Sequence, residues 1–512
     1  MRNLDPDQIS LFRILLRAAS LLWLVLSGQN ASAAPLSPSE VPDLILKIAG
    51  STIWDNNIDK LLNGTSTGNG LCLSGTLSTY KDNDASGKGT YWRAWYCQID
   101  STKVPGMAQV NPKTLILKRN KSGAVTGTYP LLEPSKKIQF MGISNPGQCA
   151  LASGSSTSYL CSTSNVGDLF LDSPDAGMLD VDPALLRDAN YIPQFETGGA
   201  TFNEPNPEVV NSILTILNSG AVIQNTPVSL NLRNALQAAQ IAGGTLATGC
   251  IGSESASCMP SLSSETLTQL FQGAITRWSD LTVNTSAGAK PLTSFAQTPI
   301  SSDLVQICRR NLGASTQAAA NAYFLNTPCS ASGKLPAAIS NAKYGPIVFY
   351  PGQVSLEEQC LHAISGGRGG TYNPTAAPGW AIGILTTERN TALSLDYRYI
   401  KLDGFAPSPE EVSNGNYRYF TEAAYVYRNQ SPKPEGDVLV LIRKIAASAS
   451  TPEIFGVLNA AIAQPWGLGS FIATSGQGYT APSKFDPNSP ITAYTHQPKG
   501  QTLDNCHGVS RQ

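Results

Sequence analysis

Between positions 305 and 316 the chain reads Val305-Gln306-Ile307-Cys308-Arg309-Arg310-Asn311-Leu312-Gly313-Ala314-Ser315-Thr316. The short apolar run at its start is typical of a buried strand, and the Ala-rich segment 317–324 after it predicts a helix. A helix that begins here presents free backbone N–H groups and the positive end of its dipole. Ser315 and Thr316 add hydroxyl donors, and the planar guanidinium of Arg310 can pair with an oxyanion. The alternative is an ordinary helix start, because Ser and Thr are common caps.

The same alternation of strand and helix extends along the chain in both directions. Residues 44–48 predict a strand that passes through small residues into a helix at 53–62. The spacing of apolar residues predicts further helices at 209–217, 263–272 and 437–446, and further strands at 221–225, 380–385 and 423–427. Strands that alternate with helices are typical of parallel sheets, so we expect an α/β protein.

The first 33 residues predict a secretory signal peptide. Arg2, Arg13 and Arg17 precede the apolar run 21–26, and Ala31-Ser32-Ala33 provides a cleavage site. A buried N-terminal helix is the alternative. Cleavage leaves about 480 residues, which is more than one hydrophobic core normally serves, so two lobes are expected. We therefore expect a periplasmic or secreted protein.

Ten cysteines agree with export, because an even number in an oxidising compartment indicates disulfides. Short separations favour four pairs: Cys72 with Cys97, Cys149 with Cys161, Cys250 with Cys258, and Cys308 with Cys329. Cys360 and Cys506 are then left over, and the sequence does not fix their pairing. No CxxC occurs, so neither a zinc site nor thioredoxin-type chemistry is expected.

Charge and motifs favour a binding protein over an enzyme. The formal net charge is −1, with no basic footprint for nucleic acid and no polybasic membrane patch. The three histidines are scattered, and neither HExxH nor GxSxG occurs, so hydrolase machinery is absent as a local motif. We expect no catalytic residues, no metal and no cofactor.

A second stretch indicates a family. Residues 262–281 read Leu262-Ser263-Ser264-Glu265-Thr266-Leu267-Thr268-Gln269-Leu270-Phe271-Gln272-Gly273-Ala274-Ile275-Thr276-Arg277-Trp278-Ser279-Asp280-Leu281. They resemble the "L…IF.G.ItnW.D" helix and turn of the phosphate-binding proteins of ABC transporters, which are type II periplasmic binding proteins. Residues 310–316 resemble the family's "RSDGSGT" ligand loop, 381–384 its "AIGY" strand, and 401–407 its "I.idGv.P" segment. The match covers roughly residues 45–472, with large insertions.

The resemblance implies a fold and a set of ligand-binding residues. The fold would be two α/β lobes with central mixed sheets flanked by helices, which close around a ligand in the cleft. Residues 49–53 stand where the family has "GATF", and residues 178–183 stand where it has "SD.PL". A Gly/Ser-rich turn of the family falls at 123–127. The implied ligands are Ser51, Thr52, the Ile53 N–H, Thr126, Asp180 as acceptor for a protonated oxyanion, Arg310, Ser315 and Thr316.

Two departures from the family lie in the ligand loop. Leu312 replaces an aspartate that normally fixes the arginine, and Ala314 replaces a serine. We therefore expect Arg310 to be held differently here. Asp180 also has an alternative role as a turn residue, because Asp in Asp-x-Asp-Pro caps backbone N–H groups.

These observations predict an organisation and a function. Lobe 1 would comprise residues 44–226 and 422–485, with a disulfide-rich insertion at about 64–170; lobe 2 would comprise 227–421, and 486–512 would be a C-terminal tail. The protein would be a monomer that captures a small oxyanion, phosphate above all, and passes it to an ABC permease. Two alternatives stay open: a secreted or surface protein that uses this fold for adhesion, scavenging or signalling, which the insertions favour, and a secreted phosphatase.

Overall fold

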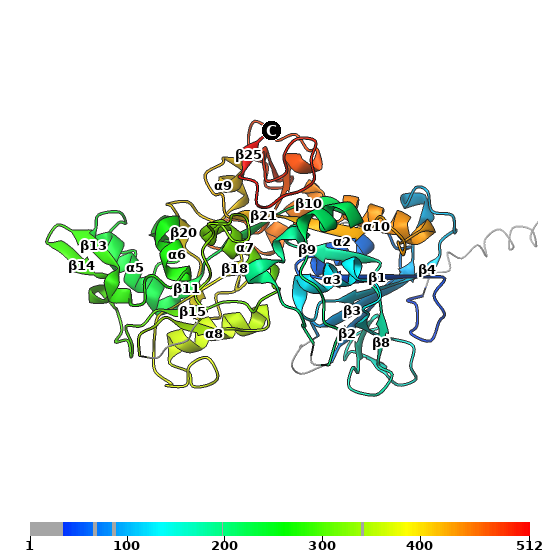
Figure 1. The fold of residues 1–512 in the computed structure, drawn as a ribbon, viewed down its shortest axis with the longest axis horizontal. Coiled ribbons are helices and arrows are strands. Elements are labelled where there is room, and N and C mark those ends of the chain that lie inside the picture. The colour runs from blue at the N-terminus through cyan, green and yellow to red at the C-terminus, as the bar shows by residue number, and fades with distance from the viewer. Residues whose placement is uncertain (1–33, 65–68, 84–88, 197, 339–342) are drawn as a thin grey trace, which may run out of the picture.

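A computed structural model describes residues 34–64, 69–83, 89–196, 198–338 and 343–512. The predicted signal peptide lies outside these residues. The chain folds into two sheet-centred halves, which lie side by side in Figure 1. Each half has a mixed sheet flanked by helices, so the predicted α/β class is confirmed. The division into lobes at residues 226/227 and 421/422 stays a prediction.

The larger sheet has twelve strands and mixes parallel with antiparallel pairs. In spatial order they are β23 (Ile491–Thr492), β22 (Phe471–Thr474), β10 (Leu214–Asn225), β21 (Phe420–Arg428), β9 (Ala176–Leu179), β1 (Leu44–Gly50), β4 (Lys113–Arg119), β3 (Trp92–Gln98), β2 (Ser78–Asp82), β7 (Ser158–Cys161) and β6 (Cys149–Leu151), while β18 (Leu385–Thr386) pairs with β10.

The centre of this sheet is parallel, and that arrangement positions the site. β1 pairs with β4 on one side and with β9 on the other, both in parallel, with Ile48 opposite Lys118 and Ala176. The carboxyl ends of parallel strands meet at one edge of a sheet, where α/β proteins place their ligands. The segments that follow Gly50, Arg119 and Leu179 therefore lie together.

Helices cover both faces of the larger sheet. One face packs against α2 (Asp55–Asn63), α10 (Gly436–Ser448) and α11 (Pro452–Ala461), and the other against α3 (Tyr129–Leu132), α4 (Pro207–Ile213) and the 3₁₀ helix η2 (Gly123–Gly127). Alternate residues of β1 enter the first core, as the period of a strand requires: Leu44, Leu46 and Ile48.

The smaller sheet has five strands: β16 (Ile347–Phe349), β15 (Gln306–Cys308), β17 (Ala381–Gly383), β11 (Val228–Ser229) and β19 (Tyr397–Arg398). β15 is parallel to both β16 and β17. Four helices surround it: α5 (Leu230–Ala242), α6 (Ser264–Phe271), α7 (Ser315–Leu325) and α8 (Val354–Gly366). Ser263 caps α6, since its side chain accepts the Thr266 N–H.

The remaining elements are short. They are the pairs β5 (Ile138–Met141) with β8 (Leu169–Asp172), β12 (Ser261–Leu262) with β20 (Lys401–Leu402), β13 (Thr282–Thr285) with β14 (Gly288–Pro291), and β24 (Tyr494–Thr495) with β25 (Ser510–Arg511), together with the helix α9 (Pro409–Ser413). The C-terminal segment, residues 491–512, packs over the middle of the molecule between the two halves (Figure 1).

One predicted helix is wrong in its second part. The apolar spacing at 209–217 predicted a continuous helix, but α4 ends at Ile213 and β10 begins at Leu214. Leu214 pairs with Arg428 and Leu217 pairs with Tyr425, so the backbone hydrogen bonds of this stretch go to β21. A strand partner in the sheet outweighs a local helical period, which the sequence cannot reveal.

Five disulfides use all ten cysteines. The predicted pairs Cys72–Cys97, Cys149–Cys161 and Cys250–Cys258 are confirmed. The predicted pair Cys308–Cys329 is wrong, since Cys308 bonds to Cys360 and Cys329 bonds to Cys506. Cys308 ends β15, and α8, which carries Cys360, packs directly on that strand. Cys329 lies beyond the end of α7, where the C-terminal segment reaches it.

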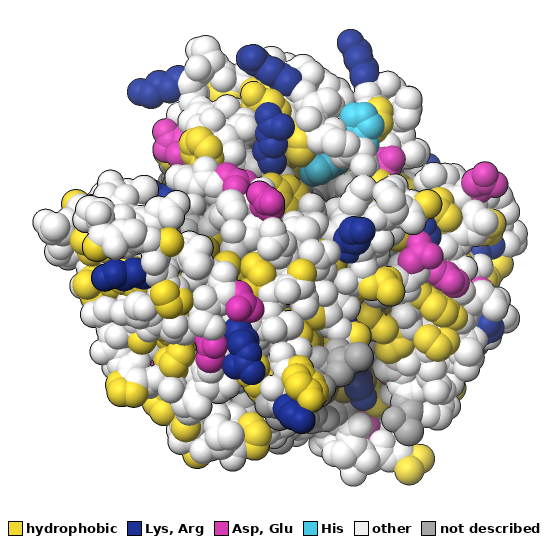
Figure 2. All heavy atoms as spheres, turned by 60° about the vertical axis from the view of Figure 1, so that its left-hand side comes forward, with side chains coloured by type: hydrophobic (Ala, Val, Ile, Leu, Met, Phe, Trp, Pro, Cys, Tyr) yellow, Lys and Arg dark blue, Asp and Glu magenta, His cyan; other side chains and the backbone are white. Residues whose placement is uncertain are grey.

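The described residues include no helix that is both long and apolar enough to cross a membrane. Figure 2 shows one face of the molecule, turned toward the five-stranded half, on which basic and acidic side chains are interspersed.

Candidate functional site

Several buried hydrogen-bond donors without partners in the protein lie at the N-terminus of α7. β15 ends at Cys308, a six-residue loop follows, and α7 begins at Ser315 without a side-chain cap. The hydroxyls of Ser315 and Thr316 are buried and accept or donate no hydrogen bond within the protein. The Arg310 guanidinium is buried with them: its Nη2 donates to the Gly352 carbonyl at 3.1 Å, and its Nε has no partner. Such groups are normally satisfied by a ligand or water.

Gly313 explains how this loop reaches the other half. Its φ of 81° lies in the left-handed region, and a Cβ there would meet the Val125 side chain at 2.7 Å. Its N–H donates to the Asn190 carbonyl at 3.1 Å. Only glycine allows this close approach, which seats the loop against η2 and turns Leu312 outward, where it is 36% exposed.

Asp180 faces this group from the larger sheet. It follows β9 directly, is 3% exposed, and its Oδ1 has no hydrogen-bond partner. Burial raises the pKa of the Asp180 carboxyl, while the hydroxyls of Ser315 and Ser51 and the charge of Arg310 act in the opposite direction. Asp180 is thus within electrostatic reach of Arg310 and Ser315, although these residues follow strands of two different sheets.

The segment 51–53 contributes unequally. Ser51 is buried beside Asp180, and its N–H donates to the Met178 carbonyl at 2.8 Å. The Ile53 N–H donates to Ser51 Oγ at 3.4 Å, so this predicted donor is already engaged. Thr52 has an exposed side chain. Of the three predicted ligands, Ser51 is therefore the one whose side chain the structure brings to Asp180.

Thr126 lies in η2, which packs against the ends of β1 and β9. Its hydroxyl is fully buried and donates to the Gly123 carbonyl at 2.8 Å. The hydrogen of this hydroxyl is thus used inside the turn, and Thr126 can offer a ligand only an acceptor.

Lys118 is a buried cation that the sequence analysis missed. It is the penultimate residue of β4, and its ammonium is fully buried. Its Nζ donates to the Ser51 carbonyl at 2.8 Å and to Asn120 Oδ1, and Asp55 Oδ1 is 3.8 Å away. Burial lowers the pKa of Lys118 to about 8, against the charges of Asp55 and Asp180. Its signal in the sequence is a lysine that directly follows the apolar run Leu115-Ile116-Leu117 within a strand.

Glu357 is a second missed residue, on α8. It is fully buried, its Oε1 accepts the Ile384 N–H at 2.7 Å, and its Oε2 has no partner. Burial raises the pKa of Glu357 to about 8, although the charge of Arg310 opposes this rise. Burial also lowers the pKa of Arg310, and the carboxylates that oppose this are Glu357 first and Asp180 second. Glu357 is thus the acidic group that acts most strongly on Arg310, although it is largely protonated at neutral pH.

Arg309 points into different surroundings from Arg310. Its guanidinium lies 4.9 Å from the centre of the Tyr350 ring, a cation–π contact, and its Nε and Nη1 are buried without partners. Neighbouring side chains of an extended segment point in opposite directions. Arg309 is therefore a packing residue at the edge of the site.

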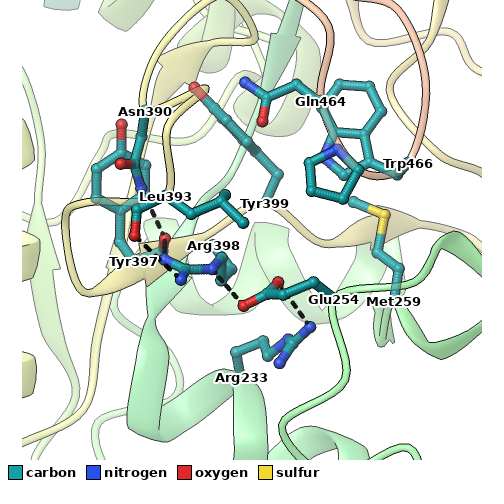
Figure 3. Close-up of a pocket in the computed structure, with 11 residues that line it drawn as sticks. Arg233, Glu254, Met259, Asn390, Leu393, Tyr397, Arg398, Tyr399, Gln464 and Trp466 are labelled. Atoms are coloured by element: carbon teal, nitrogen blue, oxygen red, sulfur yellow. Dashed lines mark hydrogen bonds and ion pairs between the residues drawn. The ribbon is translucent and has the colours of Figure 1, made fainter.

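A separate small cavity, shown in Figure 3, lies in the five-stranded half. In it Glu254 lies between Arg233 and Arg398, with oxygens 3.0 Å and 2.7 Å from their nitrogens. None of the residues predicted to bind a ligand lines it. The two arginines and one glutamate leave a net positive charge, but both guanidinium groups are already engaged with Glu254. In the part of the chain that the structure describes, no cluster of His, Cys, Asp or Glu is arranged to hold a metal ion.

Comparison with known protein families finds no match to the sequence, and no curated protein matches it either. Solved structures do match. The chain is similar to phosphate-binding proteins of ABC transporters. One is a phosphate ABC transporter substrate-binding protein of Clostridium perfringens with bound phosphate: 14% identity, 83% of this chain and 99% of that chain covered, TM-score 0.37.

Two further similar structures are a phosphate transport receptor of Vibrio cholerae and PstS of Borrelia burgdorferi, both 9% identical to this chain. The first covers 78% of this chain and 93% of its own at a TM-score of 0.35, and the second covers 81% and 97% at 0.33. The phosphate-binding proteins found by structure are the same class that the motifs at 262–281 and 310–316 resemble. The phosphate is the ligand of those proteins.

Proposed function

We propose that the protein is an exported, monomeric solute-binding protein that captures a small oxyanion, with phosphate as the expected ligand, in the cleft between its lobes. In this proposal it acts as a binding protein and delivers the anion to an ABC permease. Five disulfides support export, because such bonds persist in oxidising compartments.

One observation carries the proposal. Arg310, Ser315, Thr316 and Asp180 come from the two halves, are buried, and each have a polar side-chain atom without a hydrogen-bond partner in the described structure. An unpaired buried polar group costs about 1–3 kcal/mol, and one shared ligand would relieve all four of these atoms. A tetrahedral anion that accepts several hydrogen bonds and donates one has the matching set of groups.

The choice of anion would depend on Asp180. Arg310 pairs with any tetrahedral oxyanion and adds affinity without discrimination. An ionised Asp180 only accepts hydrogen bonds, and phosphate at neutral pH keeps a proton to donate, whereas sulfate has none. Sulfate would thus meet an unpaired like charge, which should cost it more than about a hundredfold in affinity.

Calorimetric titration of the mature chain with phosphate and sulfate tests this proposal. The wild type should bind phosphate with much higher affinity than sulfate, and Arg310→Ala should abolish binding of both anions. Asp180→Asn should weaken the binding of phosphate and allow sulfate to bind. The amide can donate a hydrogen bond to sulfate, which the carboxylate would repel. Asp175→Asn is the matched control: Asp175 is a partly buried carboxylate at the other end of β9, paired with Lys47, and its loss should leave the preference unchanged. A wild type that binds neither anion would refute the proposed function.

A further inference from the structure

Lys118 sits beneath the predicted ligand turn in a way that packing alone does not explain. Burying an ammonium group costs several kcal/mol unless its partners compensate. Asp55 is one such partner, because Lys118 Nζ lies 3.8 Å from Asp55 Oδ1, while Arg93 and Asn120 contact Asp55 Oδ2 at 3.3 Å and 2.8 Å. The shortest contact of Lys118 to the backbone is with the Ser51 carbonyl, at 2.8 Å.

This contact fixes the direction of the next N–H group. Ser51 is held from both sides: its N–H donates to the Met178 carbonyl, and its C=O accepts from Lys118. In a planar trans peptide the C=O of Ser51 and the N–H of Thr52 point in opposite directions. Lys118 thus aims the Thr52 N–H away from the strand ends, and within the described structure that N–H donates to no protein acceptor.

The charge of Lys118 matters as well as its hydrogen bond. Arg310 and an ionised Asp180 neutralise each other, so these two groups alone would leave a buried site with no net attraction for an anion. The charged groups that face Lys118 are Asp55 on α2, Arg93 on β3 and Asp180 after β9. Arg93 lies closer to Asp59, at 3.0 Å, than to Asp55, at 3.3 Å, so the charge of Lys118 acts on Asp55 as well as on Asp180.

We propose that Lys118 is a positioning residue of the oxyanion site: it holds the Ser51 carbonyl so that the Thr52 N–H faces the bound anion, and it supplies the positive charge that Asp180 would otherwise cancel. This inference rests on the proposed function. It assigns a role to β4, a strand in which no ligand-binding residue was predicted.

Replacement of Lys118 by methionine tests the role, since methionine fills the space without charge or donor. At pH 7, Lys118→Met should lower phosphate affinity at least about 30-fold, the loss of one charge-assisted contact. Lys47→Met is the control, because Lys47 is a partly buried lysine of the neighbouring strand β1 that pairs with Asp172 at 2.9 Å, away from the site. It should change phosphate affinity less than about threefold. Equal affinities of the two variants would overturn the proposal.

A pH profile separates this role from a structural one, and it needs no change at Lys118. Inorganic phosphate is almost entirely a dianion by about pH 8, so the profile is interpreted above that value, where the charge of phosphate is nearly constant. Wild-type affinity should fall as pH rises through about 8, where Lys118 loses its proton and Glu357 ionises beside Arg310. In Glu357→Gln the fall should persist through Lys118, and in Lys118→Met it should shrink to the part due to Glu357.

The outcomes distinguish the two proposals. A flat profile in Glu357→Gln would overturn the role of Lys118, and it would do so even if Lys118→Met failed to fold. An unchanged profile in Lys118→Met would overturn it too. A wild type that binds no oxyanion would refute the proposed function itself.

Discussion

At the scale of single residues, buried charge distinguishes this protein from an ordinary α/β core. Arg310, Asp180, Lys118 and Glu357 are all withdrawn from water, yet no two of them form an ion pair within 4 Å in the described structure. Interiors normally exclude such groups or pair them tightly. A bound ligand would lower this cost, and these residues therefore mark the candidate site.

Glu357 gives a pH-dependent prediction for stability. Its pKa is about 8 in the folded chain and 4.5 in the unfolded chain, so the unfolded chain loses the proton first. The free energy of unfolding should therefore fall as pH rises from about 5 to 8. Glu357→Gln keeps the acceptor for the Ile384 N–H and cannot ionise, so it should lose less stability than the wild type between pH 5 and 8.5. Urea unfolding at pH 5 and 8.5 measures this, and equal pH dependence in both proteins would contradict it.

At the scale of elements, α7 is shared between the two halves. Ala318 and Ala319 pack into the core of the larger sheet, whereas Ala320, Phe324 and Leu325 pack into the core of the smaller one. Small side chains on the first face allow the helix to approach closely. Ser315 and Thr316 begin this helix, so the packing of α7 between the two sheets fixes the position of these donors relative to Asp180.

A larger side chain on that face should therefore disturb both stability and binding. Ala319→Leu inserts three carbons into a fully buried position, and overpacking of this kind costs about 1–3 kcal/mol. It should also lower the affinity for phosphate, because α7 must shift away from Asp180. Ala322→Leu, at a partly buried position of the same helix, is the control and should have a smaller effect on both. Thermal unfolding and calorimetry report the two effects, and an unchanged Tm for Ala319→Leu would contradict the packing.

At the scale of the whole molecule, the C-terminal segment ties α7 to the larger sheet. Cys506 bonds to Cys329 beyond the end of α7, while the adjacent Asn505 exchanges two hydrogen bonds with Asp182 at 2.8 Å and 3.2 Å. Asp182 is two residues from Asp180. The segment therefore connects the turn that carries the acceptor to the helix that carries the donors.

Removal of the Cys329–Cys506 disulfide should lower the stability of the protein more than removal of a short-range disulfide does. The Cys329–Cys506 bond spans 177 residues and Cys250–Cys258 spans 8, and chain-entropy arguments give about 5 and about 2.5 kcal/mol for such loops. Cys329→Ser/Cys506→Ser should thus lower the free energy of unfolding more than Cys250→Ser/Cys258→Ser does. Its α7 amides should also exchange hydrogen faster. Equal losses, with α7 equally protected, would show that the segment does not hold the halves together.

The sequence by itself determined features that depend on near neighbours. It predicted the passage from β15 into α7 and the three disulfides with the shortest separations, because each depends on residues at most 25 positions apart. The pattern of strands and helices was enough for the α/β class, and the buried donors at Arg310, Ser315 and Thr316 were recognised from one loop.

Tertiary structure alone decided what depends on distant segments. β21 turned the end of a predicted helix into β10, and α8 brought Cys360 to Cys308 in place of the nearer Cys329. Lys118 and Glu357 joined the site because the carboxyl ends of parallel strands and the turns of a neighbouring helix meet in space, at separations that no local pattern encodes. From the sequence alone, a lysine or glutamate is expected on the surface, because these residues are rarely buried. Only the tertiary structure shows that Lys118 and Glu357 are buried near the candidate site.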